Sequence, residues 1–505
     1  MSESRPLSSL NKAQPGPAPD GLGTGLFANK NIRTGEDVLH FESPFVAVLE
    51  TQRLEDTCSG CFGKRQLETD SEDNKITLKA CTGCQIVKYC DKTCQVKDWK
   101  AAHSLECGIY QTLKPRVLPI NARAILRMVL RTGASKNGYT SQDLEELGAL
   151  ETHIQEIRNE SPAQWERIAL TSKAVKEYSG TEMEEEMISA YGAKLDLNSF
   201  NLTSAVYDRT GLYLHPFAAL MNHSCNYNCV VGFDGPELYV KAIYPIQNHE
   251  QIFISYVDAT NPVDIRKKEL RERYFFECRC EKCSSETPAS QDRNISEEAE
   301  AVAKDAYALL ESGSASDDSW KLSETIQNLI SHSWPKTQQP FISVLDESIT
   351  ADIARGEFGY GFLNSALRYL HIDRDVYSES HPIRAVHAWT LAKMAIYISQ
   401  ANPNFTLPGF VRGRDALGLI RSSGVSVDYG LIAWSVLVGL VARKAEICIV
   451  PGLKQMVEKA FLEVHGEFMT NGLDPRGMGE EIRKEWVKVR EVLQGYLTEI
   501  FGEDV

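Results

Sequence analysis

A run of metal-binding residues between positions 58 and 107 constrains this chain more than any other feature. It consists of closely spaced pairs: Cys58 and Cys61, Cys81 and Cys84, Cys90 and Cys94, and His103 and Cys107. Structural zinc needs four ligands in a tetrahedron, so these pairs supply two complete sites. The i, i+4 spacing of the last pair places both ligands on one face of a helix. The alternative, scattered cysteines that bind nothing, does not explain so many ligands at metal spacing. We therefore expect this segment to fold around two zinc ions.

A second constellation lies far downstream and is incomplete by itself. Cys278, Cys280 and Cys283 supply three ligands, whereas a closed structural site needs four. Cys225 is the candidate for the fourth ligand; otherwise it is a small core residue. Of the 13 cysteines, Cys229 and Cys448 then remain, and we expect them to be buried or idle. Thiolate ligands and free cysteines fit a reducing compartment, so we expect no disulfides.

Several short motifs stand in a fixed order around these ligands. They are Gly21 to Ala28 (GLGTGLFA), Asn198-Ser199-Phe200, Gly211 to Pro216, Asn222-His223-Ser224-Cys225, Ile254 to Asp258, and Tyr274 to Cys278. In this order, and with the cysteine sets, they resemble the SMYD family of SET and MYND domain protein-lysine methyltransferases. For the MYND finger, the resemblance implies a cross-braced pairing. Cys58, Cys61, Cys90 and Cys94 would bind one zinc, and Cys81, Cys84, His103 and Cys107 the other.

The resemblance implies an α+β fold in which the finger and a helical insert interrupt a SET β-fold. The expected parts are a disordered N-terminus (1–20), a first SET segment (21–57), the MYND finger (58–107), a helical insert (108–194), the SET core (195–262), a post-SET zinc segment (263–283), a linker (284–296), and an all-α TPR-like domain (297–505). Apolar residues at spacings of three and four, such as Ile383, Val386 and Trp389, independently predict helices in the last part. No strict 34-residue repeat accompanies them, so the TPR-like character rests on the resemblance.

The family's chemistry implies a role for each matching residue. The cofactors would be S-adenosylmethionine and three zinc ions. Tyr256 would be catalytic, its hydroxyl orienting the substrate amine, although by itself it also reads as a core residue of a strand. Tyr274 would line the lysine channel. The residues expected to contact the cofactor are Gly23, Thr24, His153, Asn198, Asn222, His223, Tyr256 and Phe276. His153, in a Leu-x-Thr-His stretch, could instead be a histidine on a helix surface.

The chain departs from the family at a few positions. The family often has a basic or amide residue where Thr24 stands, and Asn226-Tyr227-Asn228 replaces its usual Asp-Pro-Asn. His215 stands where tyrosine or aspartate is common. These departures affect substrate choice more than cofactor binding. They also leave an alternative, a SET and MYND scaffold that binds partners with little catalysis, its finger recruiting a proline-rich protein.

The net charge of the chain limits the classes of partner that it suits. The net charge is -15 and the pI about 5.4, which suits a lysine-rich protein, histone or non-histone, better than nucleic acid. Nucleic-acid binding through the finger would rest only on Lys88, Lys92, Lys97 and Lys100, which read as a solvated face. No apolar run reaches membrane-spanning length, and the N-terminus lacks the apolar centre of a signal peptide. We expect a soluble protein of the cytoplasm, the nucleus or both, with no membrane partner.

Overall fold

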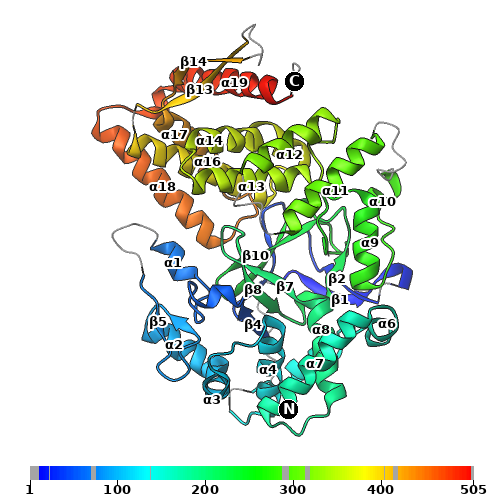
Figure 1. Cartoon of the computed structure of the whole chain (residues 1–505). Coiled ribbons are helices and arrows are strands. Elements are labelled where there is room, and N and C mark those ends of the chain that lie inside the picture. The colour runs from blue at the N-terminus through cyan, green and yellow to red at the C-terminus, as the bar shows by residue number, and fades with distance from the viewer. Residues whose placement is uncertain are drawn as a thin grey trace. The chain divides into compact units, whose positions relative to one another are not determined.

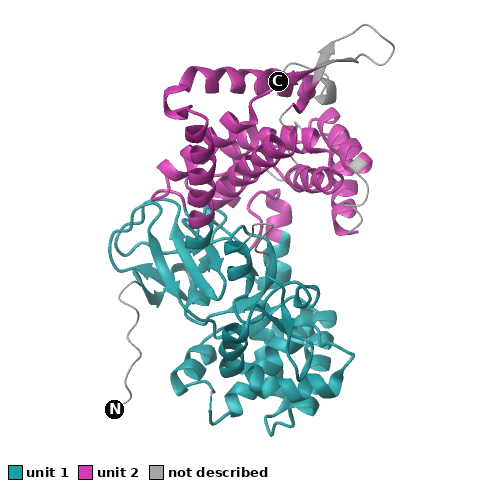
Figure 2. Ribbon diagram, turned by 90° about the vertical axis from the view of Figure 1, so that its left-hand side faces the viewer, with its two compact units in different colours: residues 1–256, 268–280, 448–453 teal, residues 257–267, 281–447, 454–505 magenta. Residues whose placement is uncertain are grey.

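The computed structural model describes residues 11–21, 23–69, 76–136, 138–286, 295–312, 319–402, 404–412 and 419–501. The chain divides into two compact units, coloured separately in Figure 2. Unit 1 contains residues 1–256, 268–280 and 448–453, and unit 2 contains residues 257–267, 281–447 and 454–505. In the described part of the chain, no helix is both long enough and apolar enough to cross a membrane.

Unit 1 is built on short sheets whose strands come from both sides of the finger. β3 (Asp37–Phe41) pairs with β11 (Glu237–Ala242), which pairs with β10 (Cys229–Asp234). β4 (Val46–Leu49) pairs with β8 (Arg209–Leu214), which pairs with β7 (Phe200–Thr203). Because β3 and β4 precede the finger and their partners follow it, finger and insert are inserted into one β-fold. This confirms the α+β fold class.

The predicted disorder of residues 1–20 is wrong for part of that stretch. β1 (Ala13–Pro17) pairs antiparallel with β2 (Thr24–Ala28), with Gly16 opposite Gly25. Prolines are tolerated in such a strand because it lies at a sheet edge, where one side of the backbone needs no ladder partner. Main-chain hydrogen bonds, rather than apolar side chains, order this segment. Its polar composition therefore gave no sign of a strand. Residues 1–10 lie outside the described residues.

The finger region contains little regular structure. Its elements are α1 (Lys64–Glu68), the two-stranded β5 (Lys79–Ala80) and β6 (Lys88–Tyr89), α2 (Lys92–Asp98), the π-turn η4 (Trp99–His103) and α3 (Ser104–Leu113). Asp91 caps α2 by accepting a hydrogen bond from the Cys94 amide, a cap that orients one predicted ligand. Part of the polar insertion between Cys61 and Cys81, residues 70–75, lies outside the described residues.

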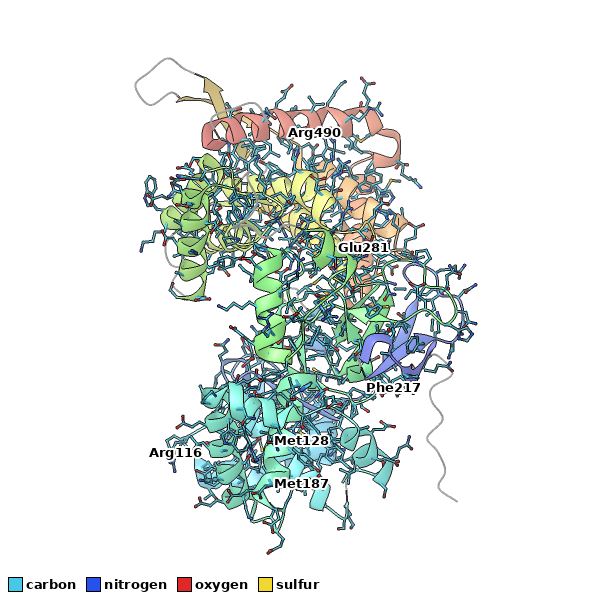
Figure 3. The ribbon with its side chains drawn as sticks, turned by 90° about the vertical axis from the view of Figure 1, so that its right-hand side faces the viewer. Arg116, Met128, Met187, Phe217, Glu281 and Arg490 are labelled. Carbon is cyan, nitrogen blue, oxygen red and sulfur yellow. The ribbon has the colours of Figure 1, made fainter. Side chains whose placement is uncertain are left out.

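The predicted helical insert is present. It contains α4 (Ile120–Gly133), α5 (Ser141–Gly148), α6 (Ile154–Glu160), α7 (Pro162–Ser179) and α8 (Glu185–Asn198). Thr140 and Asp143 form a capping box that starts α5. Met128 lies on the buried face of α4, while Arg116, just before that helix, is exposed (Figure 3). The insert therefore has its own core beside the sheets.

A ladder of arginines joins α4 to strand β4. Arg123 donates to the Leu49 carbonyl (2.6 Å), Arg127 to that of Ala47 (2.7 Å), and Arg131 to that of Phe45 (2.8 Å). Four helical residues rise about 6 Å and two strand residues about 6.6 Å, so the i, i+4 spacing of the helix matches the i, i+2 spacing of the strand. The guanidinium groups thus cover the edge of β4 that has no strand partner.

Unit 2 is mainly helical. Its helices include α10 (Glu281–Ser285), α11 (Glu297–Glu311), α12 (Ser319–Ser331), α13 (Phe341–Ala354), α14 (Phe358–Leu367), the π-helix η8 (Arg368–Ile372), α15 (Asp373–Val376), α16 (Pro382–Ala401), α17 (Tyr429–Ala442), α18 (Pro451–Thr470) and α19 (Gly479–Phe501) (Figure 1). Successive helices pack in pairs, among them α13 with α14 and α16 with α17. This confirms the helical C-terminal region.

The expectation that this region is all-α is wrong in one place. β13 (Thr406–Arg412) and β14 (Leu419–Ser426) form an antiparallel pair that packs on α19. The two segments are rich in β-branched and apolar residues and flank a segment with turn-forming residues, which is the usual hairpin pattern. Residues 413–418, between the strands, lie outside the described residues.

Candidate active site and zinc centres

Three groups of side chains have the geometry of zinc sites. They are Cys58, Cys61, Cys90 and Cys94; Cys81, Cys84, His103 and Cys107; and Cys225, Cys278, Cys280 and Cys283. In each group, the four potential ligand atoms lie within 4.8 Å of one another. These are the sets that the spacing and the resemblance predict, including the distant Cys225 and the cross-braced finger pairing.

The distances fit tetrahedral zinc closely. With Zn–S bonds of about 2.3 Å, two sulfurs on one ion are about 3.8 Å apart. The Sγ atoms of Cys61 and Cys90 are 3.8 Å apart, as are those of Cys81 and Cys107. His103 Nε2 lies 3.4 Å from Cys81 Sγ and 3.6 Å from Cys84 Sγ, near the expected S···N edge of about 3.6 Å. Zinc therefore fits these donor sets without rearrangement.

A parallel pairing brings the Asn222-His223-Ser224-Cys225 motif next to the tyrosine segment. β9 (Asn222–His223) pairs with β12 (Phe253–Ile254), and the Ser224 amide donates to the Ile254 carbonyl (3.1 Å). β12 contains only two residues and ends before Tyr256. The pairing places His223 against Tyr256, since their ring centroids are 5.3 Å apart.

His223 links the third zinc set to the catalytic candidate. Its Nδ1 accepts a hydrogen bond from the Tyr256 amide (3.0 Å), so the proton of the neutral ring is on Nε2. Nε2 lies 3.3 Å from Cys225 Sγ and donates to it. One imidazole therefore connects a predicted zinc thiolate to the backbone of Tyr256 and fixes their relative position.

The hydroxyl of Tyr256 has a fixed orientation. It donates to the Met221 carbonyl oxygen at 2.6 Å. Burial raises the pKa of Tyr256, so the phenol is protonated at neutral pH. Because its one proton is engaged with Met221, the lone pairs of the hydroxyl oxygen remain available to accept a hydrogen bond.

Further aromatic rings lie beside Tyr256 and His223. The Tyr274 ring lies 4.9 Å from the Tyr256 ring, and the Tyr274 hydroxyl donates to the Tyr256 carbonyl at 3.4 Å. Burial raises the pKa of Tyr274 as well. The Phe276 ring is 5.9 Å from that of His223. The three aromatic residues and the histidine form a wall suited to an apolar stem carrying a cationic or amine head.

The glycine-rich segment reaches the same place from the N-terminal side. The Asn222 side chain lies 3.5 Å from the Thr24 carbonyl. Gly23 has φ +70°, a conformation that favours glycine, and a Cβ built on it would meet no atom within 4 Å. A Cβ on Gly25, in contrast, would collide with Gln251 at 2.4 Å. Gly23, Thr24 and Asn222 thus lie together.

The other two predicted residues, Asn198 and His153, both lie in the helical insert. Asn198, at the end of α8, donates to the Glu151 carbonyl (3.1 Å). His153 follows two residues later and lies 5.5 Å from the Phe275 ring. Because Phe275 stands between Tyr274 and Phe276, this contact connects His153 to the aromatic wall. No direct contact joins His153 or Asn198 to Thr24 among the interactions of the described residues.

Sequence reasoning missed several residues here. Phe275, which was not predicted, has a positive φ of 59°, like the predicted residue His153 with 44°, and such angles are rare outside glycine and concentrated at functional sites. Met221 contributes a carbonyl that leaves no trace in a side-chain motif. Lys194 holds the turn before His153, and Arg127 supports the finger. Only the consecutive aromatics at 274–276 offered a sequence signal.

Comparison with known proteins agrees with this geometry. The SET domain family model matches residues 23–257. Histone-lysine N-methyltransferase SMYD3 of Mus musculus is 28% identical over 387 residues, covering 74% of this chain and 86% of the relative. SET domain and MYND-type zinc finger protein 6 of Schizosaccharomyces pombe is 30% identical over 266 residues, covering 52% of this chain and 50% of the relative. N-lysine methyltransferase SMYD2 of Gallus gallus is 29% identical over 272 residues, covering 53% and 59%. The first of these alignments is longer than the SET match, so the similarity extends beyond that domain.

Proposed function

The chain belongs to the SMYD family of SET and MYND domain proteins, and from that premise we propose how its residues carry out S-adenosylmethionine-dependent methylation of a protein lysine. The observation that carries the proposal is the fixed hydroxyl of Tyr256, held by the Met221 carbonyl beside His223. S-adenosylmethionine, when bound, supplies a methyl group on a positively charged sulfur. What remains for the protein is to hold the amine correctly.

Tyr256 is the catalytic residue of this proposal. Its hydroxyl proton points to Met221, so its oxygen accepts a hydrogen bond from an N–H of the substrate amine. This hydrogen bond orients the amine and leaves the nitrogen lone pair free. The same oxygen is an electronegative partner for a methyl group carrying partial positive charge. Tyr274, in ring contact with Tyr256, lines the path of the lysine stem.

The partly buried aromatic surroundings also favour the reactive form of the substrate. An ammonium ion loses hydration when it enters a narrow apolar channel, which lowers its pKa and favours the neutral amine. Tyr256 and Tyr274 are themselves protonated there, because burial raises the pKa of each. They therefore add no negative charge that would hold the lysine in its charged form.

The residues around this tyrosine hold the cofactor. Gly23 and Thr24 offer backbone groups to its methionine part, supported by the open space at Gly23. Asn222 and His223 of β9 would contact the cofactor, and Phe276, whose ring lies beside that of His223, would enclose its adenine. The full set is Gly23, Thr24, His153, Asn198, Asn222, His223, Tyr256 and Phe276. The zinc sets give this arrangement rigidity, since structural zinc contributes folding energy directly.

The substrate is a lysine in a histone or non-histone protein. The chain's net charge of -15 favours association with a lysine-rich partner. On the finger, Val96 and Trp99 are 39% and 44% exposed, and this apolar surface supports binding of a proline-rich partner there. A protein with such substrates acts in the cytoplasm, the nucleus or both.

Two measurements test the assignment. Calorimetric titration with S-adenosylhomocysteine should give one saturable site per chain. Tyr256→Phe should keep that binding and lose most methyl transfer, about 100-fold or more, because only the orienting hydroxyl is removed. Tyr244→Phe, at an exposed tyrosine, is the matched control and should keep full activity. Undiminished turnover by Tyr256→Phe refutes the role of its hydroxyl, and absence of cofactor binding in the zinc-loaded protein favours the scaffold instead.

A further inference from the structure

We propose that Lys194 is a positioning residue for the cofactor site, holding in place the turn that presents His153. This inference rests on the proposed function, because it assigns to that turn a part in binding S-adenosylmethionine. Lys194 does not touch the catalytic tyrosine, and it lies outside the sequence motifs that predict the active site.

The ammonium of Lys194 is saturated by backbone carbonyls. Its Nζ donates to the carbonyl oxygens of Leu147 (2.8 Å), Gly148 (2.8 Å) and Leu150 (2.6 Å). An ammonium group has three N–H donors, so each has one acceptor. The residue is 8% exposed. A buried lysine committed wholly to one turn is specialised for holding that turn.

The turn needs such a group because it follows a helix end. α5 ends at Gly148, and the last carbonyls of a helix have no partner within the helix. The Leu147 carbonyl also accepts from the amides of Ala149 and Leu150, and a cation at this position adds a further donor and interacts favourably with the negative end of the helix dipole. Asn198, one turn further along α8, donates to the Glu151 carbonyl (3.1 Å). Two side chains of one helix therefore fix four carbonyls between residues 147 and 151.

The restraint that Lys194 places on the turn reaches the active site through the contact between His153 and Phe275, two residues with strained backbone angles. His153 has φ 44° and Phe275 has φ 59°, and their rings are 5.5 Å apart. Residues with such positive φ angles are strained and persist only where their surroundings hold them. Lys194 and Asn198 provide that restraint on the His153 side. Loss of the ammonium would release the turn, and His153 would no longer be fixed against the aromatic segment 274–276.

Calorimetry of the intact chain with S-adenosylhomocysteine tests this. Lys194→Met keeps the length of the side chain and removes its donors, and we expect the Kd to rise about tenfold or more. Lys173→Met, an exposed lysine on α7, should change it less than twofold. His153→Ala should also raise the Kd. The double variant His153→Ala with Lys194→Met should be no weaker than the worse single variant, because Lys194 acts through His153.

The methyl-transfer kinetics and hydrogen exchange separate positioning from general instability. Lys194→Met should raise the KM for S-adenosylmethionine while kcat changes little, and its zinc content should stay unchanged. In the wild-type chain, S-adenosylhomocysteine should slow amide exchange at residues 149–153, which tests the idea even if the variant does not fold. No slowing there, an unchanged Kd in Lys194→Met, or additive effects in the double variant overturns the proposal. If the wild-type chain binds no cofactor, the proposed function itself fails.

Discussion

Glu106, a fully buried carboxylate next to the predicted zinc ligand Cys107, is held by two hydrogen bonds from Arg127, Nε to Oε1 at 2.6 Å and Nη2 to Oε2 at 2.8 Å. Burial alone would raise the pKa of Glu106, but the Arg127 guanidinium overrides it and holds that pKa at about 2. Arg127 also donates to the Ala47 carbonyl of β4. One side chain thus connects the finger to the sheet of the SET fold.

Glu106→Gln should weaken zinc binding at the second finger site. The carboxylate lies 3.8 Å from His103 Nδ1, the ring nitrogen facing away from the sulfurs and beyond hydrogen-bond distance, so its negative charge favours the histidine as a ligand of a cation. The substitution also removes the nearer of two carboxylates that pair with the buried Arg127 and leaves Asp98 at 3.8 Å, which costs up to about 3–5 kcal/mol. Competition with a chromophoric chelator should show faster loss of one zinc and a lower melting temperature.

Glu68→Gln serves as the control for this experiment. Glu68 is an exposed residue at the end of α1, so both zinc release and melting should match the wild type. Equal chelator resistance in Glu106→Gln and the control would show that the buried carboxylate does not support the metal.

Arg123→Met should destabilise unit 1 through the edge of β4. Arg123 is 3% exposed and donates to the carbonyls of Leu49 and Leu118. Each buried carbonyl left without a donor costs about 1–3 kcal/mol. Urea unfolding should therefore show a lower midpoint, whereas Arg116→Met, at an exposed position, should leave it within error. A midpoint equal to that of the control would mean that water replaces the guanidinium at the strand edge.

The features that could be predicted from sequence are those that depend on the spacing of particular side chains along the chain. The finger ligands stand in local pairs, so their geometry follows from the chain itself. Cys225 could be assigned to the third set only by counting ligands and by resemblance, because nothing local connects it to Cys278. The pairing of β9 with β12, together with the contact between Tyr256 and Tyr274, supplies the missing physical link.

The features that escaped prediction depend on main-chain groups. Lys194 and Arg127 donate to carbonyls, which every residue possesses, so sequence gives no sign of which lysine or arginine is buried. Strand β1 is ordered by backbone pairing with β2 in spite of a composition typical of disorder. The positive φ angles of His153 and Phe275 result from tertiary restraint, which local propensity does not record.

Cys225→Ser should remove one of the three zinc ions. A hydroxyl is a poor replacement for a thiolate ligand, and the same change alters the acceptor of His223 Nε2. We therefore expect two zincs per chain by elemental analysis, a lower melting temperature, and weaker S-adenosylhomocysteine binding, since His223 also holds the Tyr256 amide. Cys229→Ser, at a buried cysteine outside the metal sets, should retain three. Three zincs in the Cys225 variant would contradict the long-range ligand assignment.

His381 should make the stability of unit 2 depend on pH. Its Nδ1 accepts a hydrogen bond from the Ile383 amide (3.3 Å) and so caps α16, which requires a neutral ring. Burial, aided by the charges of His387 and Arg384, lowers the pKa of His381 to about 3, against about 6.5 in an unfolded chain. The folded state therefore takes up its proton less readily. The stabilisation is complete above about pH 6.5 and is lost as pH falls from there toward about 3, by about 2 kcal/mol between pH 7 and pH 5.

His381→Asn keeps a good N-cap without a titrating group. Thermal melts at pH 7 and pH 5 should show a smaller pH-dependent decrease in the variant than in the wild type. Equal decreases would mean that His381 is not the group that titrates.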